Sequence, residues 1–249
     1  MFLVPSVGGV LSAVVGGRHV ANVSVLTEDL CVEWRLFEGV PGEEVRELLK
    51  VARRRRFARN EVVFHRDDPA DSLHLIGKGR FALRVMTPVG NVATIAVRGP
   101  GESFGEMALV ASGGRRSATV AALEEAETFA VYQGDFERLR GRYPNVNEVL
   151  LRFLVSEVRM LNERLLEALY VPVERRVRRR LLELAELYPP GGDGGVVVPL
   201  TQEILAELAG TSRETVNKVL RAEQERGVLE LLRGKTRLLD VEALRRRVR

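Results

Sequence analysis

The chain has 249 residues, of which 45% are hydrophobic and 29% charged, and this is the composition of a folded globular protein rather than a disordered or collagen-like one. The length fits between one and two domains, and we expect two. The net charge of +4 lies entirely in the last third, because residues 1–171 carry 22 basic and 22 acidic side chains whereas residues 172–249 carry 16 and 12.

The longest apolar tract runs from Phe2 to Gly17. Pro5 and two glycines interrupt it, and no basic residue precedes it. It is therefore neither a membrane span nor a good signal peptide. We expect residues 1–35 to be a disordered extension, unless the start codon has been assigned too early. The single cysteine, Cys31, excludes an internal disulfide and Cys-ligated zinc or iron–sulfur sites, which favours a reducing cytoplasm.

A helix is predicted from Pro41 to Arg56. Val45, Leu48 and Leu49 recur at helical spacing within it. We interpret the basic run 53–56 as a solvated face that extends this helix.

A β-rich segment follows from about Val62 to Tyr132. Its short apolar runs are 62–64, 73–76, 81–86, 92–97, 118–122 and 128–132. Turns containing glycine and proline separate these runs, which predicts an antiparallel roll or barrel. We place this domain at residues 36–143.

After Pro144 the apolar residues recur every three or four positions. They are Val146, Leu150, Phe153, Leu154, Val158, Leu161, Leu165 and Ala168 or Leu169. The pattern predicts one long amphipathic helix over residues 144–171. A roll of about seventy residues covers only one side of such a helix, so we expect its twin in a second subunit to cover the other and form a homodimer. Packing on its own domain alone is the alternative.

Pro172 is a predicted break after this helix and begins a C-terminal domain over residues 172–249. A helix is expected from Glu174 to Leu187, and the Pro- and Gly-rich stretch 189–195 must be a loop.

The strongest motif lies at residues 201–221, where two helical patterns meet at a tight turn. Gly210 suits the left-handed turn, Ala206 is small where the helices would cross, and Ser212 suits the cap of the second helix. This is the pattern of a helix-turn-helix. Its predicted buried residues are Leu205, Leu208, Val216 and Val219.

Three side chains near the start of the second helix suit the reading of base edges. Arg213 and Lys218 match guanine O6 and N7, and Glu214 can accept from cytosine N4. The candidates for phosphate contacts are Thr201, Gln202, Ser212 and Thr215. Two short strands within 227–239 predict a wing that brings Lys235 and Arg237 near the DNA backbone. The alternative, helix packing without DNA, fits the positive charge less well.

A second motif lies in the predicted roll, where Gly105-Glu106 precedes Arg116-Ser117 by eleven residues. Arg116 suits a phosphate through two parallel hydrogen bonds, and Ser117 adds a hydroxyl donor. A short helix after Gly105 would offer backbone amides to an anion, and Glu106 can accept from a sugar hydroxyl. The pattern suggests recognition of a ribose phosphate. The alternative is a surface turn in which Glu106 and Arg116 pair only with each other.

Over about residues 36–241 the chain resembles the CRP/FNR family of bacterial transcription regulators. The matching segments are Phe104-Gly-Glu-Met-Ala-Leu, Arg116-Ser-Ala-Thr-Val and Gly210-Thr-Ser-Arg-Glu-Thr-Val-Asn-Lys, in the family's order. The resemblance, which is closest to the cAMP-responsive branch, implies an α+β fold. Its parts are an N-terminal double-stranded β-roll (jelly roll), a long dimerisation helix and a C-terminal winged helix-turn-helix.

Carried over by position, the resemblance also implies ligands and partners. The residues that would hold cAMP or a related cyclic nucleotide are Gly105, Glu106, Met107, Arg116, Ser117, Leu161 and Asn162. Arg213, Glu214 and Lys218 would read half-sites resembling TGTGA in palindromic double-stranded DNA. RNA polymerase would be a further partner, and no membrane or metal is implied.

Two positions depart from the cAMP-responsive pattern. Leu161 stands where that pattern has Thr, and a lost hydrogen bond weakens binding by about 1–3 kcal/mol. Asn162 can still bond an adenine edge. Lys218 replaces a usual Arg, so a bidentate guanine contact becomes a point-charge contact.

A ligand-gated dimeric transcription factor is the leading hypothesis, and no catalytic constellation supports an enzyme. Two alternatives stay open. One is a regulator that binds DNA without cAMP or senses another ligand, and the other is a nucleotide-binding module whose C-terminal domain docks a protein.

Overall fold

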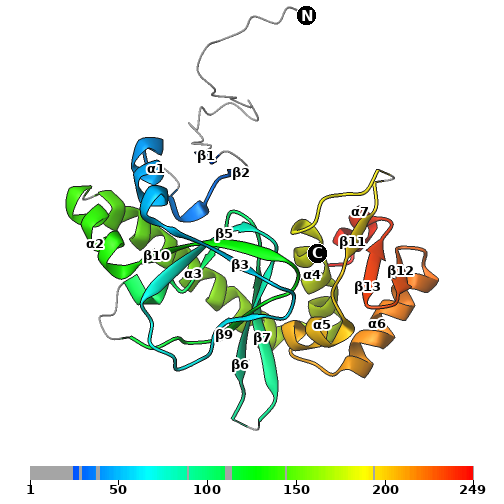
Figure 1. The fold of residues 1–249 in the computed structure, drawn as a ribbon. Coiled ribbons are helices and arrows are strands. Elements are labelled where there is room, and N and C mark those ends of the chain that lie inside the picture. Colours follow the sequence, from blue (N-terminus) through cyan, green and yellow to red (C-terminus); the bar gives the residue numbers. More distant parts are fainter. Residues whose placement is uncertain are drawn as a thin grey trace, which may run out of the picture.

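The computed structural model describes residues 25–27, 30–37, 40–88, 90–109, 114–143, 145–192 and 194–248. It has an N-terminal β-roll, a long helix and a C-terminal domain of helices with a small sheet, as the predicted α+β class requires. The long helix, α3 (Asn145–Tyr170), runs from the end of the molecule that carries α1 and α2 towards the C-terminal domain (Figure 1). Most of the predicted N-terminal extension, with Pro5, lies outside the described residues.

The roll consists of two four-stranded antiparallel sheets. In spatial order the first contains β3 (Arg53–Phe57), β10 (Ala126–Tyr132), β5 (Ser72–Lys78) and β8 (Ser103–Phe104). The second contains β4 (Val62–Phe64), β9 (Thr119–Ala122), β6 (Phe81–Met86) and β7 (Val92–Arg98). Phe57, Phe81 and Phe104 form the centre of the apolar cluster between them. The six predicted apolar runs are all strands, and β3 and β8 add to them.

The basic run 53–56 belongs to strand β3, so its interpretation as a helical face was wrong. Helix α1 (Gly42–Val51) ends before it, and β3 pairs with the neighbouring strand β10. Arg54 Nε and Arg56 Nε donate to the two carboxylate oxygens of buried Glu127, at 2.6 and 3.3 Å. The backbone pairing and the buried carboxylate, both far away in sequence, decide the conformation.

The folded part of the chain also begins earlier than predicted. A hairpin of β1 (Val25–Thr27) and β2 (Leu30–Val32) leads into the 3₁₀ helix η1 (Arg35–Phe37). Trp34 is buried, donates from Nε1 to the Ile76 carbonyl at 2.9 Å, and meets the ring of Phe129 edge-on. The expectation of disorder up to residue 35 was therefore wrong for this segment, because the indole anchors it to the roll.

Helix α3 is the single long helix that the apolar period predicts. Within one chain, only the apolar side chains near its start are buried. Val146, Val149 and Leu150 are buried against α1, α2 (Gln133–Arg142) and η1. Most of its later apolar side chains are exposed, namely Leu151, Val155, Val158, Leu161, Leu165, Leu166, Leu169 and Tyr170.

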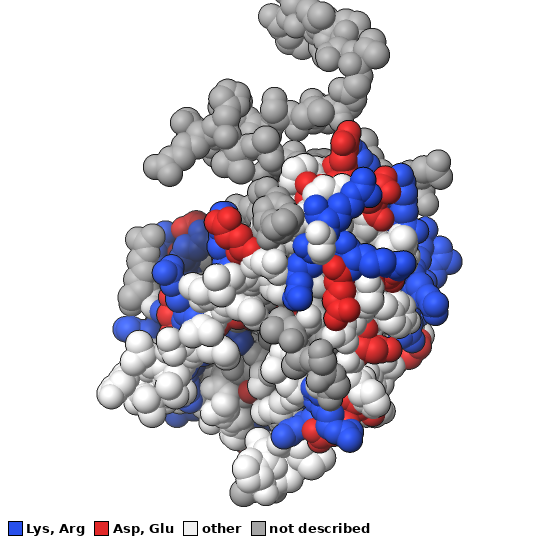
Figure 2. All heavy atoms as spheres, turned by 90° about the vertical axis from the view of Figure 1, so that its left-hand side faces the viewer, with Lys and Arg blue, Asp and Glu red and all other residues white. Residues whose placement is uncertain are grey.

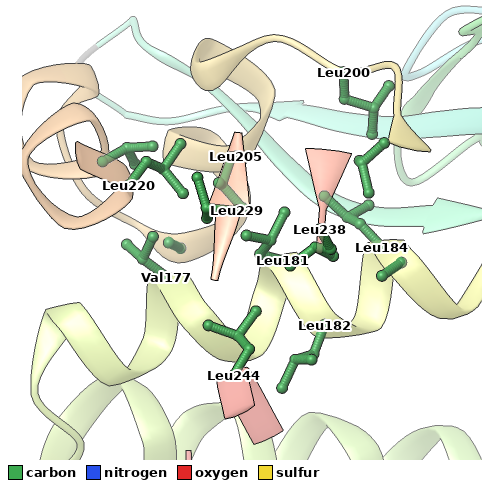
Figure 3. Packing of buried hydrophobic residues seen from close by; sticks show 14 of the residues in the cluster. Val177, Leu181, Leu182, Leu184, Leu200, Leu205, Leu220, Leu229, Leu238 and Leu244 are labelled. Carbon is green, nitrogen blue, oxygen red and sulfur yellow. The ribbon is translucent and has the colours of Figure 1, made fainter. Parts of the chain in front are cut away.

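The C-terminal domain contains the predicted helix-turn-helix. Its helices are α4 (Val173–Glu186), α5 (Gln202–Ala209), α6 (Arg213–Glu225) and α7 (Val241–Arg246). The wing strands β12 (Leu229–Leu232) and β13 (Lys235–Leu238) are joined by β11 (Val196–Val198), a third strand that we did not predict. Leu181 of α4, Leu220 of α6 and Leu238 of the wing lie in one apolar cluster, shown in Figure 3.

The two domains are in direct contact through one face of the roll. Ala82 joins the apolar cluster of the C-terminal domain, and the Thr94 hydroxyl of β7 donates to Glu207 of α5. The Arg80 guanidinium donates to Glu124 at 2.6 Å and lies 3.7 Å from the ring centroid of Tyr188. The position of the helix-turn-helix is therefore set by the roll as well as by α3.

Glu223 of α6 offers a test of this packing. It is fully buried, and its Oε1 atom lies 2.8 Å from Arg178 Nε and 3.4 Å from Arg247 Nε. We expect Glu223→Ala to lower the free energy of unfolding by about 3 kcal/mol, because it removes the common partner of these cations. Glu225→Ala, at an exposed position of the same helix, should change it by less than about 0.5 kcal/mol. Equal losses in urea denaturation would contradict this role.

Candidate functional site

The predicted ribose-phosphate motif folds into one compact site, which we call the cassette: residues 104–109 together with 116 and 117. Gly105 has φ +82°, and a Cβ there would lie 2.7 Å from Arg116 Nη1 and 3.0 Å from the Ser72 carbonyl. Only glycine permits both the backbone conformation and the close approach. The fold thus brings Gly105 and Arg116 into contact across the gap that separates them in sequence.

Arg116 is a buried cation that hydrogen bonds hold in place inside the roll. Its side chain is buried, and its guanidinium donates to the Ser72 carbonyl at 2.6 Å and to Asp71 Oδ1 at 3.1 Å. The guanidinium also lies over the ring of Phe64 at 4.0 Å. Burial lowers the pKa of Arg116, and the nearby carboxylate of Asp71 opposes that shift.

The Arg116 side chain retains an unused donor. Its Nε atom is buried and has no hydrogen-bond partner among the residues that the structure describes. A buried donor without a partner is costly, and an anionic ligand at the cassette would relieve that cost. The described hydrogen bonds of Arg116 go to Ser72 and Asp71, so the interpretation in which it pairs only with Glu106 does not describe this site.

Glu106 opens the short 3₁₀ helix η2 (Glu106–Leu109) that follows Gly105. Burial raises the pKa of Glu106, the carboxylate of Glu157 raises it further, and Arg98 and Arg116 lower it. A hydroxyl group that donates to this carboxylate would stabilise its charged form. Met107 and Ser117 are exposed at the rim of the cassette.

His74 is the buried aromatic neighbour of the cassette. It stacks on Phe104 with ring centroids 5.0 Å apart, and its Nδ1 lies 3.0 Å from Thr128 Oγ1. Burial and the charges of Arg116 and Arg55 lower the pKa of His74 to about 3. The ring is therefore neutral at physiological pH. No cluster of three or more His, Cys, Asp or Glu side chains suited to a metal occurs in the described part of the chain.

Leu161 and Asn162 lie on the exposed side of α3, and Leu161 is 59% exposed. Positions 151, 155, 158, 162, 165 and 169 alternate steps of four and three, and we call them the seam. This is the spacing of a coiled-coil interface, in which Asn162 takes a position where a buried Asn fixes register. Glu157, one helical turn before Leu161, is an α3 residue whose charge acts on Glu106 of the cassette within one chain.

Sequence reasoning missed the ion pair between Arg98 of β7 and Glu157 of α3. Arg98 Nη2 lies 2.7 Å from Glu157 Oε2, and Arg98 Nη1 lies 2.9 Å from Glu102 Oε1. Arg98 directly follows the predicted apolar run 92–97, which contains no charged residue, and that position was the available signal.

The three predicted base-reading residues, Arg213, Glu214 and Lys218, are all exposed on α6. Hydrogen bonds from the Glu214 backbone amide and from the Ser212 side chain lower the pKa of Glu214, so its carboxylate is charged at neutral pH. Lys235 is exposed on the wing. These side chains have the accessibility that base and phosphate contacts require.

The four candidates for phosphate contacts also shape the motif itself. Thr201 Oγ1 and Ser212 Oγ cap α5 and α6 by accepting from Ile204 N and Thr215 N, at 3.4 and 3.3 Å. Gln202 Oε1 accepts from Asn217 Nδ2 at 3.1 Å, which links the two helices. Thr215 is half-buried. Their donor groups remain suited to phosphate oxygens.

Charge on the roll side of the molecule is mixed in sign. Figure 2 shows Lys and Arg interspersed with Asp and Glu on the face that carries α1 and α2, beside a broad area without charged groups. This agrees with the balance of charges in residues 1–171. Among the described residues, no helix combines the length and hydropathy that crossing a bilayer demands.

Comparisons with known proteins agree with this geometry. Residues 54–143 match the family described as cyclic nucleotide-binding domain, and residues 175–247 match the family described as Crp-like helix-turn-helix domain. A CRP-like cAMP-activated global transcriptional regulator of Mycobacterium tuberculosis is 33% identical over 217 residues, which cover 86% of this chain and 96% of that protein.

A cyclic AMP receptor protein of Thermus thermophilus is 35% identical over 209 residues, covering 84% of this chain and 94% of that protein. A solved transcriptional regulator of the CRP/FNR family from the same organism superposes with a TM-score of 0.67. It is 25% identical in sequence and covers 79% of this chain and 98% of its own.

The close approach at Gly105 gives a test of the cassette. We expect Gly105→Ala to lower the free energy of unfolding by about 1–3 kcal/mol, since the new methyl group meets Arg116 and the left-handed backbone is strained. Gly134→Ala in α2, where a Cβ meets nothing within 4 Å, should raise it by up to about 1 kcal/mol. If both variants unfold at the same denaturant concentration as the parent, the contact is unimportant.

Proposed function

The chain belongs to the CRP/FNR family of transcriptional regulators, and we propose that it is a homodimer whose binding to DNA is controlled by a cyclic nucleotide, with cAMP as the first candidate. The observation that carries this proposal is Arg116, whose buried side chain has an unused Nε donor and whose Nη1 atom lies against Gly105. The same chain exposes Arg213, Glu214 and Lys218 on α6. The names of the relatives, which are cAMP-activated or cAMP receptors, support the choice of nucleotide.

The residues present fit a ribose and a cyclic phosphate. Arg116 and Ser117 would hold the phosphate, and Glu106 would accept a hydrogen bond from a ribose hydroxyl. Met107 would border the nucleotide from the rim. Leu161 and Asn162 would approach the base from α3, where Asn162 supplies a polar amide and Leu161 only apolar contact.

The exposed seam of α3 supports the dimer. Leu151, Val158 and Leu165 are each more than half exposed in one chain. Such a continuous apolar surface on a soluble helix marks an interaction site. A second copy of α3 would cover it and would set Asn162 against its counterpart.

The DNA target would be a palindrome with half-sites resembling TGTGA. Arg213, Glu214 and Lys218 would contact base edges, and two recognition helices about 34 Å apart would enter successive major grooves. Thr201, Gln202, Ser212, Thr215 and Lys235 would contact phosphates. We place this activity in the cytoplasm, and RNA polymerase would be a protein partner of the DNA-bound regulator.

A regulator that binds DNA without cAMP is the second candidate. It is favoured by two observations. Leu161 offers no hydrogen bond to a base, and the Arg116 guanidinium already has Asp71 and Ser72 as partners. In that case the DNA affinity would be the same with and without nucleotide.

Replacement of Arg116 tests the nucleotide site. Arg116→Gln removes the cation that would meet the phosphate, so we expect cAMP affinity to fall by about 2–3 kcal/mol, or roughly 30- to 150-fold. The matched control is Arg115→Gln, because Arg115 is exposed and its guanidinium donates to the Asp67 carbonyl at 2.7 Å. Titration calorimetry with cAMP and with cGMP measures the nucleotide affinity of each variant and of the parent. Unchanged affinity in a folded Arg116→Gln protein would exclude the cassette as the site.

Replacement of Glu214 tests the DNA contact. Glu214→Ala should reduce discrimination at one base pair of the half-site by about 1–3 kcal/mol, since a carboxylate acceptor for cytosine N4 is lost. Fluorescence anisotropy with single-base variants of a TGTGA palindrome, at fixed salt, measures it. Glu225→Ala, at the far end of α6, should leave the preference unchanged. The same preference in the Glu214 variant would mean that the helix docks differently.

A further inference from the structure

Arg98 occupies the space between the cassette and α3. It lies at the end of β7, and its guanidinium bridges two carboxylates: Glu102, in the turn before the cassette, and Glu157, on α3. The three side chains are only 14%, 17% and 24% exposed. Ion pairs shielded from water in this way interact more strongly than surface pairs.

The local charges are not balanced. Glu106 is a third carboxylate near the same guanidinium, and the charges of Arg98 and Glu157 act on it in opposite directions. Glu102 is also tied to its own turn by a hydrogen bond from Gly99 N at 2.8 Å. Glu106 in the cassette and Glu157 on α3 therefore compete for electrostatic interaction with the Arg98 guanidinium.

Glu157 faces the roll from the side of α3 that lies away from the seam. It stands one residue before seam position 158, and Arg164, seven residues later on the same face, donates to the Ile95 carbonyl of β7. Strand β7 is thus fixed to α3 at two points two helical turns apart. A displacement of the Arg98 side chain would therefore alter a contact with α3, the helix that carries the predicted dimer contacts.

We propose that the Arg98–Glu157 ion pair couples nucleotide binding at the cassette to the position of α3, so that Arg98 and Glu157 are positioning residues for DNA binding. This proposal rests on the proposed function. A ribose hydroxyl that donates a hydrogen bond to Glu106 would replace Arg98 as the partner of that carboxylate, which leaves the Arg98 guanidinium to Glu157. The pair is then stronger in the occupied protein than in the empty one, which is the differential contact that any allosteric coupling requires.

The experiment measures the coupling factor, which is the ratio of the DNA Kd without cAMP to the DNA Kd at saturating cAMP, by fluorescence anisotropy with a TGTGA palindrome. Calorimetry gives the cAMP Kd separately. We expect Glu157→Gln and Arg98→Gln to lower the coupling factor by roughly fivefold or more, within the usual range of allosteric couplings. Their cAMP Kd should rise by no more than the factor lost in coupling, because linkage is reciprocal and neither side chain is proposed to hold the phosphate.

Two further proteins separate coupling from simple structural damage. The double variant Arg98→Gln with Glu157→Gln should lose no more coupling than either single variant, because each single change already removes the same ion pair. Glu163→Gln, at an exposed position of α3, should behave as the parent does. If a Gln variant unfolds at a lower temperature than the parent, the coupling factor is measured instead in Arg98→Lys. This variant keeps the charge but loses the planar guanidinium, and it should show a reduced coupling factor.

The outcomes are distinct. Parent-like coupling in both Gln variants, or losses of coupling that add up in the double variant, overturns this proposal while the proposed function stands. A parent protein that binds cAMP by calorimetry but shows a coupling factor of one also overturns it. Absence of cAMP and cGMP binding to the parent defeats the proposed function, and this proposal with it.

Discussion

The burial of one guanidinium, that of Arg116, constrains the whole sensor domain. A buried cation must be surrounded by acceptors and by groups that tolerate its charge. The structure meets this need with the carbonyl of Ser72, the carboxylate of Asp71 and the ring face of Phe64. The backbone of Gly105 then closes over the guanidinium because no side chain stands in the way. The result is a guanidinium whose position is fixed by the roll itself.

Helix α3 connects the roll, which contains this guanidinium, to the C-terminal domain. Its first part is buried in the roll domain, its middle is bound through Arg98 and Glu157, and its end leads through Pro172 into the C-terminal domain. Buried Glu167 near that end pairs with Arg179 and Arg180 of α4, so the angle at the proline is held by ion pairs. The helix is thus a rigid connection between a binding site and a DNA-reading domain.

The C-terminal domain is held from a second direction as well. Thr94 and Glu207 join β7 to α5, and Arg80 lies against Tyr188. Burial raises the pKa of Tyr188 to about 12, so its hydroxyl stays neutral beside the guanidinium. Because β7 also carries Arg98, the strand that meets α3 near the cassette is the strand that meets the helix-turn-helix. Strand β7 therefore contributes to both connections.

Local sequence determined every feature whose signal lies within one element. The helix-turn-helix was predictable because Gly210, Thr201 and Ser212 act on their own neighbours as turn and caps, and the length of α3 followed from its apolar period. Gly105 and Arg116 could be paired in advance only because their motif resembles that of a known family.

Features that depend on distant partners were decided by the tertiary structure. The basic run 53–56 is a strand because β10 and Glu127 lie beside it, and propensity within the run could not show that. Trp34 belongs to the roll because the Ile76 carbonyl and Phe129 receive its indole. The Arg98–Glu157 pair joins residues from a strand and a helix that meet only in the fold. Sequence alone specified the elements and their chemistry, whereas burial and long-range pairing decided which charged groups meet, because the energy of a charge depends on its surroundings.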